Sequence, residues 1–454
     1  MLRKSRRGFL KDLAMMGAGV AAGSQLTGCR TFFAPGAKGS AIMGAHYAPL
    51  DKVRIGIIGV GARGGGAVHR LINVPGAEIV AISDLYSDRA ENHAKWLQSQ
   101  GRPMPKLYAG TPDAWKGLCD SDEVNLVYIT SPWKLHTPMA LYAMRAGKHA
   151  VSEVPIAVTI DECWELVETS EKEQRHCMML ENCCYGQSEM FALMLCRNGV
   201  LGELVHGEGA YLHNLADYKM SRTGYQGMWR LEFSKEHNGN PYPTHGLGPI
   251  CQYMNIHRGD KMDYLVSVSS GQFGLTEFAR DHFGAEDERT RWEYKLGDQN
   301  TTVIRTNRGR TIMVQHNTTN ERPYSRINTI QGTKGILSDY PLRVALAPNS
   351  HSWMKDEDLA QLMKKYCHPL WDKSGEMAKK VGGHGGMDFL MDLRLCHCLT
   401  NGLPLDIDVY DSVLWSSLVP LTEQSVLKRG QSVDVPDFTR GAWRTAKPLG
   451  IVGV

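Results

Sequence analysis

The sequence contains no long run of a single charge. Its 51 Lys and Arg residues nearly balance 48 Asp and Glu residues, which leaves a formal net charge of +3 over 454 residues. Because no long basic run with interleaved aromatic residues follows the N-terminus, a nucleic-acid partner is disfavoured, and we expect a small, roughly neutral ligand instead. The hydrophobic fraction of 42% is ordinary for a soluble globular protein, and the length allows two cores, so we expect two domains.

The paired cysteine spacings of a zinc site are absent as well. The eleven cysteines are scattered along the chain, and the neighbours Cys183 and Cys184 rarely bridge each other. Cys396 and Cys398 flank His397, but packing inside a helix explains this group better than metal binding, because cysteine is among the most buried residue types. No disulfide framework can therefore be inferred.

A complete set of metal ligands is also not visible. His384 and Asp388 lie four residues apart across a glycine turn, without an obvious third ligand nearby. Because two ligands do not make a site, we interpret this segment as a glycine-shaped loop near the active-site cleft. We expect no metal.

The N-terminus lacks a run long enough for a stable transmembrane helix, but it reads as an export signal. Residues 5–11 (SRRGFLK) carry the twin-arginine pattern, and a short apolar stretch follows them. Residues 26–29 (LTGC) resemble a bacterial lipobox, which implies a signal peptide over residues 1–28 and a lipid on Cys29. We expect a flexible tether over residues 29–51 and a lipid-anchored protein in the periplasm or cell envelope. The alternative is a basic amphipathic helix on the mature protein.

A glycine-rich turn follows the first predicted strand directly. Residues 53–58 (VRIGII) predict a buried parallel strand, and Gly59, Gly61 and Gly64 form a G-x-G-x-x-G pattern after it. The first glycine permits the tight turn, the second admits a pyrophosphate, and the third lets a helix over residues 65–73 pack against the strand. The amides at the start of that helix would face the phosphates, so the pattern predicts a Rossmann dinucleotide site.

An acidic residue ends the second predicted strand. Residues 78–83 (EIVAIS) lead into Asp84, which lies 20 residues after Gly64. A carboxylate at this point can accept hydrogen bonds from both ribose hydroxyls and would repel a 2′-phosphate. The sequence therefore predicts NAD rather than NADP as the cofactor.

Further strands follow in the same pattern. They are predicted over residues 125–130, 149–152 and 177–180, with helices over residues 137–146 and 160–174. In doubly wound sheets, ligands bind at the carboxyl ends of the strands. The residues that follow these strands are thus candidates for the binding site.

The order of these motifs resembles that of a known superfamily. H-x-x-x-A at residues 136–140 and A-G-K-H-x-x-x-E-x-P at residues 146–155 resemble the glucose-fructose oxidoreductase and inositol dehydrogenase superfamily, over about residues 52–430. The resemblance implies an α/β fold, with an N-terminal Rossmann domain of doubly wound parallel sheet and a C-terminal α/β domain with a large open, mostly antiparallel sheet. Its dehydrogenases carry a lysine between Glu and Pro at this strand end. Here Val154 takes that place and cannot polarise a hydroxyl.

Several motifs resemble one branch of that superfamily more closely. Residues 133–136 (WKLH), 153–155 (EVP), 181–185 (ENCCY) and 241–249 (PYPTHGLGP) together are similar to glycoside hydrolase family 109, the NAD-dependent α-N-acetylgalactosaminidases. The resemblance implies a glycosidase that oxidises carbon 3 of the sugar transiently with NAD. Loss of the proton on carbon 2, elimination at carbon 1, addition of water and return of the hydride would follow.

The same resemblance implies which residues form the site. Cofactor contacts are implied for Gly59, Gly61, Arg63, Gly64, Asp84, Trp133, His136, Glu153, Val154 and Asn182. Contacts to a small carbohydrate or glycan terminus are implied for Tyr211, Arg230, Tyr242, Thr244, His245 and Tyr324. Trp229, next to Arg230, could stack on a pyranose face or belong to the core.

Two side chains are candidates for catalytic proton transfer. His245 offers an imidazole, the side-chain group that proteins use most often for proton transfer, and Pro243 constrains the loop that presents it. Its alternative role is to cap a helix that starts near Gly248. Tyr185, just past a strand end, would act as acid or base beside the sugar, and its alternative role is ordinary packing with a satisfied hydroxyl. The sequence leaves open which of the two transfers which proton.

The domain plan follows from these assignments. We expect the Rossmann domain over residues 52–180, a substrate-binding α/β domain over residues 181–385, and C-terminal helices and a tail over residues 386–454 that pack back on the cleft. Strands of the second domain are predicted over residues 204–210, 264–269 and 311–316. Open sheets of this kind often pair face to face, so a homo-oligomer is an alternative to a monomer.

Two other function classes stay open beside the glycosidase. An NAD-dependent sugar or cyclitol dehydrogenase fits the dinucleotide site, but Val154 argues against it. A non-catalytic sugar-binding module would keep the fold for its shape alone. The intact glycine pattern and the assembled motifs argue against that module.

Overall fold

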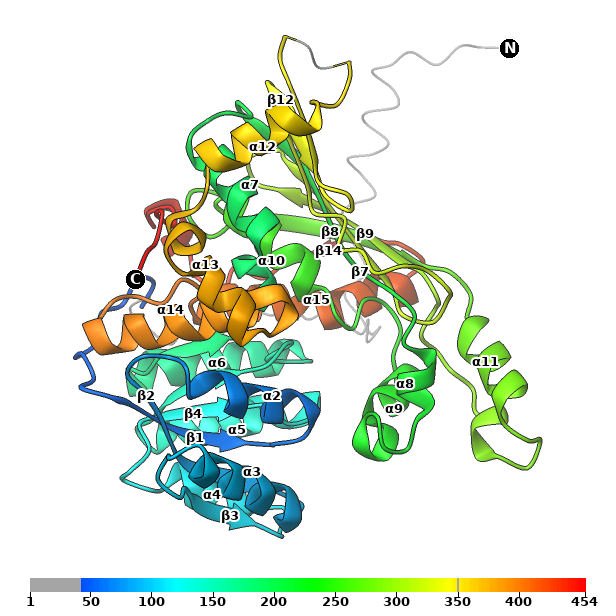
Figure 1. The fold of residues 1–454 in the computed structure, drawn as a ribbon. Coiled ribbons are helices and arrows are strands. Elements are labelled where there is room, and N and C mark those ends of the chain that lie inside the picture. The colour runs from blue at the N-terminus through cyan, green and yellow to red at the C-terminus, as the bar shows by residue number, and fades with distance from the viewer. Residues whose placement is uncertain (1–41, 349–350) are drawn as a thin grey trace, which may run out of the picture. The chain divides into compact units, whose positions relative to one another are not determined.

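The computed structural model describes residues 42–348 and 351–454 (Figure 1). The predicted signal peptide, Cys29 and most of the predicted tether therefore lie outside the described residues. Within these two ranges, no helix combines the length and the apolar character that a membrane span requires.

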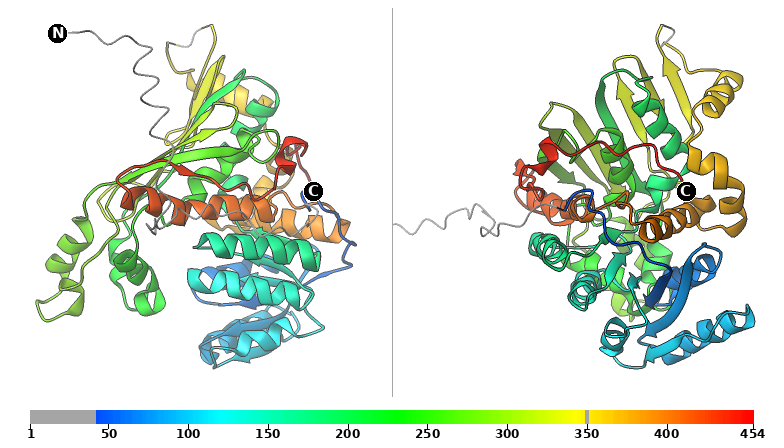
Figure 2. Two further views of the ribbon diagram at one scale, coloured as in Figure 1. Left: turned by 180° about the vertical axis from the view of Figure 1, so that it is seen from behind. Right: turned by 90° about the vertical axis from the view of Figure 1, so that its left-hand side faces the viewer.

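Six parallel strands form the first sheet, in the order β3-β2-β1-β4-β5-β6. They are β1 (Val53–Ile58), β2 (Ala77–Asp84), β3 (Lys106–Ala109), β4 (Leu126–Ile129), β5 (His149–Ser152) and β6 (Cys177–Met179). Every residue of β4 and β5 is buried, as expected where helices cover both faces of a parallel sheet (Figure 2). The predicted strands are confirmed within one residue at each end. Edge strand β3 was not predicted, because none of its residues is fully buried and no hydrophobic pattern marks it.

The strand register brings the predicted cofactor residues together. Ile58 at the end of β1 pairs with Ser83 on β2 and with Ile129 on β4. The next residue of each strand is thus carried to the same edge. Gly59, Asp84 and Thr130 consequently emerge side by side, although they are far apart in the sequence.

Helices α2 (Ala62–Leu71), α3 (Ser87–Ser99), α4 (Ala114–Cys119), α5 (Trp133–Arg145) and α6 (Ile160–Glu173) connect these strands. Helix α5 begins one turn earlier than its predicted start at residue 137, so the WKLH motif lies in the first helical turn and not in a loop. The Trp133 ring packs against the rings of Trp229, Phe233 and Tyr242 at centroid distances of 5.0, 5.2 and 5.7 Å. This tertiary packing stabilises the extra turn, which local sequence could not indicate.

A second, mostly antiparallel sheet follows, and it confirms the predicted fold class. Its order is β13-β12-β11-β7-β10-β9-β8-β14, and its central pair β7 and β10 is parallel. The strands are β7 (Leu204–Leu212), β8 (Met262–Ser269), β9 (Asn300–Thr306), β10 (Thr311–Asn317), β11 (Thr329–Gly332), β12 (Gly335–Ser338), β13 (Arg343–Leu346) and β14 (Val433–Asp434). The predicted strands over residues 204–210, 264–269 and 311–316 fall within β7, β8 and β10.

Helix α10 (Thr244–Tyr253) lies directly on β7. A Cβ atom added to Gly209 on β7 would sit 2.2 Å from the Gly246 carbonyl oxygen, and one added to Gly246 would sit 2.1 Å from the Ala210 nitrogen. Only glycine at both positions allows the two backbones to approach this closely. The contact places His245, at the start of α10, beside Tyr211 on β7, with ring centroids 5.4 Å apart.

The C-terminal helices contact both sheets. On α14 (Met387–Asn401), Asp392 accepts hydrogen bonds from Arg70 Nε at 3.1 Å and from the Tyr128 hydroxyl at 3.0 Å. On α15 (Val409–Leu427), the Ser412 and Ser416 hydroxyls accept from backbone amides of the first domain, while β14 joins the second sheet beside β8. Other helices outside the arm described below are η1 (Asn182–Tyr185), α7 (Gln187–Arg197), α12 (Asp356–Lys365), α13 (Pro369–Val381), η4 (His384–Gly386) and η5 (Ala442–Arg444).

A helical extension projects from the second sheet along the first domain (Figure 1). We call it the arm; it comprises residues 216–236 and 274–294, with α8 (Ala216–Met220), η2 (Gln226–Met228), α9 (Trp229–Glu236), α11 (Gly274–His282) and η3 (Glu288–Thr290). It has a small core of its own around Met220, Leu231, Leu275 and Tyr294. The arm contacts the first domain where Arg89 donates to Gln226 and where Lys134 pairs with Glu236 at 2.9 Å.

Candidate functional site

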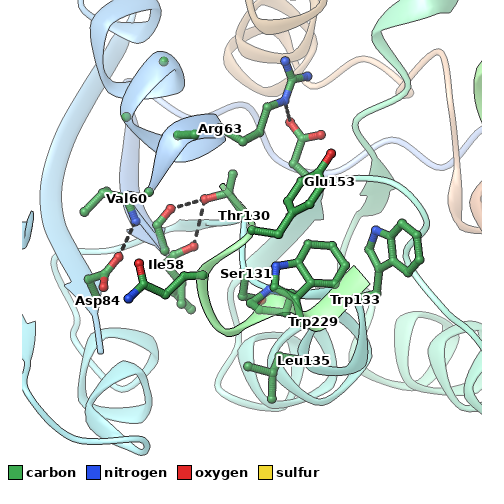
Figure 3. A pocket seen from close by; sticks show the side chains of 18 of the residues that line it. Ile58, Val60, Arg63, Asp84, Thr130, Ser131, Trp133, Leu135, Glu153 and Trp229 are labelled. Carbon is green, nitrogen blue, oxygen red and sulfur yellow. Dashed lines mark hydrogen bonds and ion pairs between the residues drawn. The ribbon is translucent and has the colours of Figure 1, made fainter. Parts of the chain in front are cut away.

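A cavity of about 1140 Å³ runs between the first sheet, the arm and helix α10. Figure 3 shows its first-domain side, where the strand ends carry Asp84, Thr130 and Glu153 around the glycine turn. Because parallel strands end at one edge, residues distant in the sequence line one surface here. The cavity is large enough for a dinucleotide with a sugar beside it.

The backbone requires glycine at two of the three positions of the turn, Gly59 and Gly64. Gly59 adopts φ +88°, a conformation that favours glycine. A Cβ atom on Gly64 would lie 1.9 Å from the Gly59 carbonyl oxygen, so helix α2 can approach the turn only without a side chain there. Gly61 lines the cavity, and a Cβ atom added to it would meet nothing closer than 3.6 Å. Glycine at this position therefore leaves cavity space that a side chain would fill.

Donors suited to a pyrophosphate are free at the start of α2. Gly61 caps this ten-residue helix without a side-chain hydrogen bond, and its first turn carries no acidic residue. The amides of the first turn are therefore available to an anion. Next to the turn, Asp84 accepts from the Val60 amide at 2.8 Å and the Tyr86 amide at 2.9 Å, which fixes its carboxylate at the end of β2 (Figure 3). These residues fit a dinucleotide whose ribose meets Asp84.

An ion-pair network lies beside the glycine turn, around Arg63. Arg63 Nε donates to Glu153 at 2.6 Å and its Nη1 donates to Asp388 at 2.7 Å. Asn182 also donates to Asp388, and His384 contacts the same carboxylate at 2.9 Å. Burial alone would raise the pKa of Asp388, but the Arg63 guanidinium holds it below its usual range. Asp388 was not predicted as a site residue, although the glycine turn before it was placed near the cleft.

Other predicted cofactor residues line the same cavity: Trp133, His136, Glu153, Val154 and Asn182. His136 is buried, and its two ring nitrogens lie 2.7 Å from the Pro155 carbonyl oxygen and 2.6 Å from that of Ser131. The imidazole thus ties two strand ends together beneath the cavity. Gly64 does not line the cavity, and its contribution is the close approach of helix and turn.

His245 and Glu181 form a hydrogen-bonded pair on the opposite side. His245 Nδ1 donates to Glu181 Oε1 at 2.7 Å, and only 12% of the His245 side chain is exposed, toward the cavity. Burial would raise the pKa of Glu181, but the contact with His245 lowers it, so the carboxylate stays ionised. With Nδ1 engaged, Nε2 is left as the nitrogen that can take a proton. The sequence did not indicate this partner of His245.

Aromatic rings surround the imidazole. Tyr211, Tyr242 and His245 lie with centroids 4.6 to 5.4 Å apart, and all three line the cavity. Arg230 lies on the Tyr242 ring at 5.0 Å from its centroid, and Trp229 beside it also lines the cavity. Burial raises the pKa of Tyr211 to about 12, so its hydroxyl keeps its proton at neutral pH. Four of the six predicted sugar-binding residues are thus brought together.

Tyr185 lies elsewhere, and this contradicts its predicted catalytic role. The residue is in η1, its side chain is buried, and its hydroxyl donates to Asp406 at 3.2 Å. It does not line the cavity. The chain turns after Asn182, so Tyr185 points away from the strand edge and packs under α14. The packing alternative for Tyr185 is the one that the contacts support.

Thr244 and Tyr324 also do not line the cavity. Thr244 is fully buried at the start of α10, next to His245. Tyr324 is 40% exposed, with its ring 6.3 Å from that of Tyr211, and its hydroxyl accepts from Arg326 at 2.9 Å. Their predicted sugar contacts stay predictions.

One group of potential metal donors is present among the described residues. Glu181, Cys183 and His245 each place one donor atom within 4.8 Å of the others. Burial raises the pKa of the Cys183 thiol well above its usual value, so the sulfur keeps its proton and is a poor ligand. We interpret the group as the His245–Glu181 pair with a neutral thiol beside it.

Sequence comparisons identify the family. A family described as "Glycosyl hydrolase 109, C-terminal domain" matches residues 185–445, and "Oxidoreductase family, NAD-binding Rossmann fold" matches residues 53–181. A "Glycosyl hydrolase family 109 protein" of Shewanella pealeana is 46% identical over the full length of both chains. The chain belongs to glycosyl hydrolase family 109.

Other relatives agree with this family. The "Alpha-N-acetylgalactosaminidase" of Bacteroides fragilis is 47% identical over 89% of this chain and 96% of that protein. Family 109 membership and the matched Rossmann domain make the protein an NAD-dependent glycoside hydrolase acting on carbohydrate. Its cofactor is NAD, and the glycine turn and Asp84 are the residues that fit it.

Solved structures share the fold. A levoglucosan dehydrogenase in complex with NADH and levoglucosan covers 85% of this chain and 100% of its own, with a TM-score of 0.66 and 19% identity. The myo-inositol 2-dehydrogenase of Lactobacillus plantarum covers 85% of this chain and 100% of its own, with a TM-score of 0.58 and 15% identity. At these identities the likeness concerns the fold alone.

Proposed function

We propose that the protein hydrolyses terminal α-N-acetylgalactosaminides by transient oxidation at carbon 3 of the sugar. The observation that carries the proposal is the His245–Glu181 pair, in which His245 faces the same cavity as the glycine turn and Glu181 is buried beside it. The name of the B. fragilis relative supports the substrate, and Val154 in place of a lysine argues against net oxidation. Bound NAD supplies a hydride acceptor at the start of the cycle and the hydride donor at its end.

His245 is assigned the proton on carbon 2. Oxidation of carbon 3 to a ketone acidifies that proton, and Nε2 of a neutral imidazole can remove it. Glu181 acts through His245: its carboxylate fixes the ring orientation and stabilises the imidazolium that forms. Glu181 is 0% exposed, so water does not compete for this hydrogen bond.

The bond changes in the sugar balance without an external oxidant. The electron pair left by the carbon 2 proton forms a carbon 1–carbon 2 double bond as the carbon 1–oxygen bond breaks, and the leaving group takes a proton. Water then adds to carbon 1 of the enone, carbon 2 regains a proton, and the ketone is reduced by the returned hydride. The net reaction is hydrolysis.

The proposal is tested with an aryl α-N-acetylgalactosaminide that carries deuterium on carbon 2, cleaved in ordinary water. The released sugar is expected to have lost the label, because the base exchanges its proton with solvent before return. A His245→Asn variant should lose both cleavage and label exchange by about 10²- to 10⁴-fold. Cleavage with full retention of the label would contradict the proposal.

The same assay separates the dehydrogenase alternative, against which Val154 argues. A dehydrogenase would build up NADH in step with oxidised sugar and leave the glycosidic bond intact. The proposed cycle leaves the NAD content of the protein unchanged. A binding module would do neither.

We also propose that the protein is exported by the twin-arginine route and anchored by a lipid on Cys29, on the basis of residues 5–11 and 26–29. A cofactor that is returned to its starting state after each cycle needs no exchange with a cytosolic pool. Replacement of Arg6 and Arg7 by lysine should retain the protein in the cytoplasm, and Cys29→Ser should move it from the membrane to the soluble fraction. Unchanged fractionation of both variants would contradict the proposal.

A further inference from the structure

Two of the cations that line the cavity, Arg89 and Arg230, have no carboxylate partner among the described residues; Arg89 donates instead to Gln226. Arg230, on α9 of the arm, lies in a cage of four aromatic rings, with its guanidinium carbon 4.3 Å from the centroid of Tyr225 and 4.9 to 5.2 Å from those of Trp133, Tyr242 and Trp229. Arg63 and Arg70, which line the same cavity, both pair with carboxylates. Arg230 makes no such pair within the described ranges, and its Nε is buried without an acceptor.

A buried lysine lines a small cavity together with Arg230. Lys219 on α8 is 4% exposed, and its Nζ donates to the Thr318 hydroxyl at 2.8 Å, again without a carboxylate pair among the described residues. Arg230 and Lys219 line one small cavity together with Tyr211, Tyr242 and His316. Both cations are thus held against the two tyrosines of the predicted sugar site.

Nearby basic groups respond to this excess of positive charge. Burial and then the charge of Arg230 lower the pKa of Lys219 to about 7. The pKa of His213 is lowered to about 4, first by burial and then by its basic neighbours His245, Arg230 and Lys219. The pKa of His316 is also lowered, by burial and by the charges of Lys219 and Arg230. His213 and His316 therefore stay neutral, and among the described residues no carboxylate pairs with Arg230.

An unpaired charge in a low-dielectric site is destabilising unless a ligand uses it. A neutral sugar does not neutralise it, whereas an anion that forms during the reaction would. Interactions that strengthen only as charge develops accelerate the chemical step rather than ground-state binding.

We propose that Arg230 is a catalytic residue that stabilises the anion formed on the carbon 3 oxygen when carbon 2 of the oxidised sugar is deprotonated. The inference rests on the proposed function. As the carbon 2–hydrogen bond breaks, its electron pair moves toward the carbon 3 carbonyl and leaves negative charge on that oxygen. Arg230 donates to that oxygen, and the charge returns through carbon 2 as the bond to the leaving group breaks. Lys219 is a positioning residue that adds to the field at Arg230.

The geometry places the cation and the base around one ring. Arg230 lies 5.0 Å and His245 lies 4.9 Å from the Tyr242 centroid. A sugar against Tyr242 can therefore meet both groups at neighbouring carbons. Tyr242 would orient the sugar between them, which is a requirement for proton removal and charge stabilisation in one step.

The test measures cleavage and carbon 2 label exchange for Arg230→Gln in the NAD-loaded protein. Both rates are expected to fall by about 10²- to 10³-fold, with a much smaller change in KM. Arg230→Lys keeps the charge without the planar fork and should recover part of the loss. Arg222→Gln, an arm arginine already paired with Glu288 at 3.1 Å, is the matched control and should leave both rates unchanged.

The outcomes distinguish this inference from the proposed function. If the parent protein itself keeps the carbon 2 label, the proposed function fails whatever Arg230 does. If the parent loses the label and Arg230→Gln raises KM with kcat unchanged, Arg230 only binds the sugar and the inference fails. Should Arg230→Gln not fold, Lys219→Met provides the second measurement. This variant is expected to have a lower kcat and an unchanged KM. The matched control is Lys235→Met in the same arm, because Lys235 already pairs with Glu232. Equal kcat values in the two variants would overturn the inference.

Discussion

The two walls of the cavity handle charge in opposite ways. On the cofactor wall, formed by the first domain and the start of α14, Arg63 is paired with Glu153 and Asp388, and anion-binding capacity comes from backbone amides. On the substrate wall, formed by α10, β7 and the arm, Arg230 lies among aromatic rings and pairs with no carboxylate of the described residues. The first wall is organised to hold a ligand that stays. The second is organised for charge that appears only during a reaction.

The largest expected effect breaks the cofactor wall. Gly64→Ala places a Cβ atom 1.9 Å from the Gly59 carbonyl oxygen, and this backbone atom cannot move aside without opening the turn. Overpacking of this kind destabilises proteins by about 1–3 kcal/mol, and here it also displaces the amides that face the cofactor. The variant should be isolated without NAD and without activity.

Gly66→Ala is the matched control in the same helix, because its Cβ atom would meet only Arg70 at 3.5 Å. It should retain NAD. A Gly64→Ala protein with full NAD content would contradict the role given to this glycine.

The next effect concerns the base on the substrate wall. Glu181→Gln removes the carboxylate that orients His245 and stabilises its protonated form, so kcat should fall by about 10²- to 10⁴-fold with KM little changed. Glu189→Gln, at a buried glutamate paired with Arg326 away from the cavity, should lower stability and leave kcat alone. Equal kcat losses in both variants would show that Glu181 has a structural role only.

Stability against acid sharpens the comparison on the cofactor wall. Because ion pairing lowers the pKa of Asp388, its contribution is complete above the pKa of the unfolded chain and is lost as pH falls through the lower, folded value. Asp388→Asn leaves Arg63 with one carboxylate less, and breaking a buried pair costs about 3–5 kcal/mol. Denaturation at several pH values should show that the variant is less stable than the parent at pH 7. The difference between their free energies of unfolding should become smaller in acid. A difference in free energy of unfolding that does not change with pH would contradict the lowered pKa of Asp388.

The smallest effect, and the only gain, is expected on the substrate wall. Burial lowers the pKa of Lys219 from 10.5 to about 7, so between those values the unfolded chain binds a proton that the folded protein does not. Stability therefore decreases as pH falls from 10.5 to 7 and stays lowered below that. Lys219→Met should raise Tm by a few degrees at pH 7, with a smaller gain at high pH. A lower Tm would mean that the ammonium is paired in a way that the contacts do not show.

The same contrast explains what could be predicted from the sequence. Gly59, Gly61 and Gly64 share one local turn, and Asp84 ends the next strand, so spacing alone identified the glycine turn and the carboxylate beside it. His245 and Glu181 are 64 residues apart, and Arg63 and Asp388 are 325 residues apart, so no local pattern could pair them. A glutamate at the end of β6, at the same edge as Glu153, was the signal that could have marked Glu181.

The error at Tyr185 has a related cause. Proximity to a strand end suggested a place in the site, but the direction of a side chain depends on the turn that follows. The chain forms η1 after Glu181, which keeps Asn182 at the cavity and turns Tyr185 toward Asp406. The extra first turn of α5 was missed for a similar reason, because it depends on the packing of Trp133 against the arm.

The most direct test of the account is hydrolysis of an unlabelled aryl α-N-acetylgalactosaminide in D₂O, with the released sugar analysed by NMR and the NAD content of the protein measured before and after. One carbon-bound deuterium is expected, on carbon 2 of the released sugar, with no net change in bound NAD. A hydrolysed sugar with hydrogen at every ring carbon would contradict it.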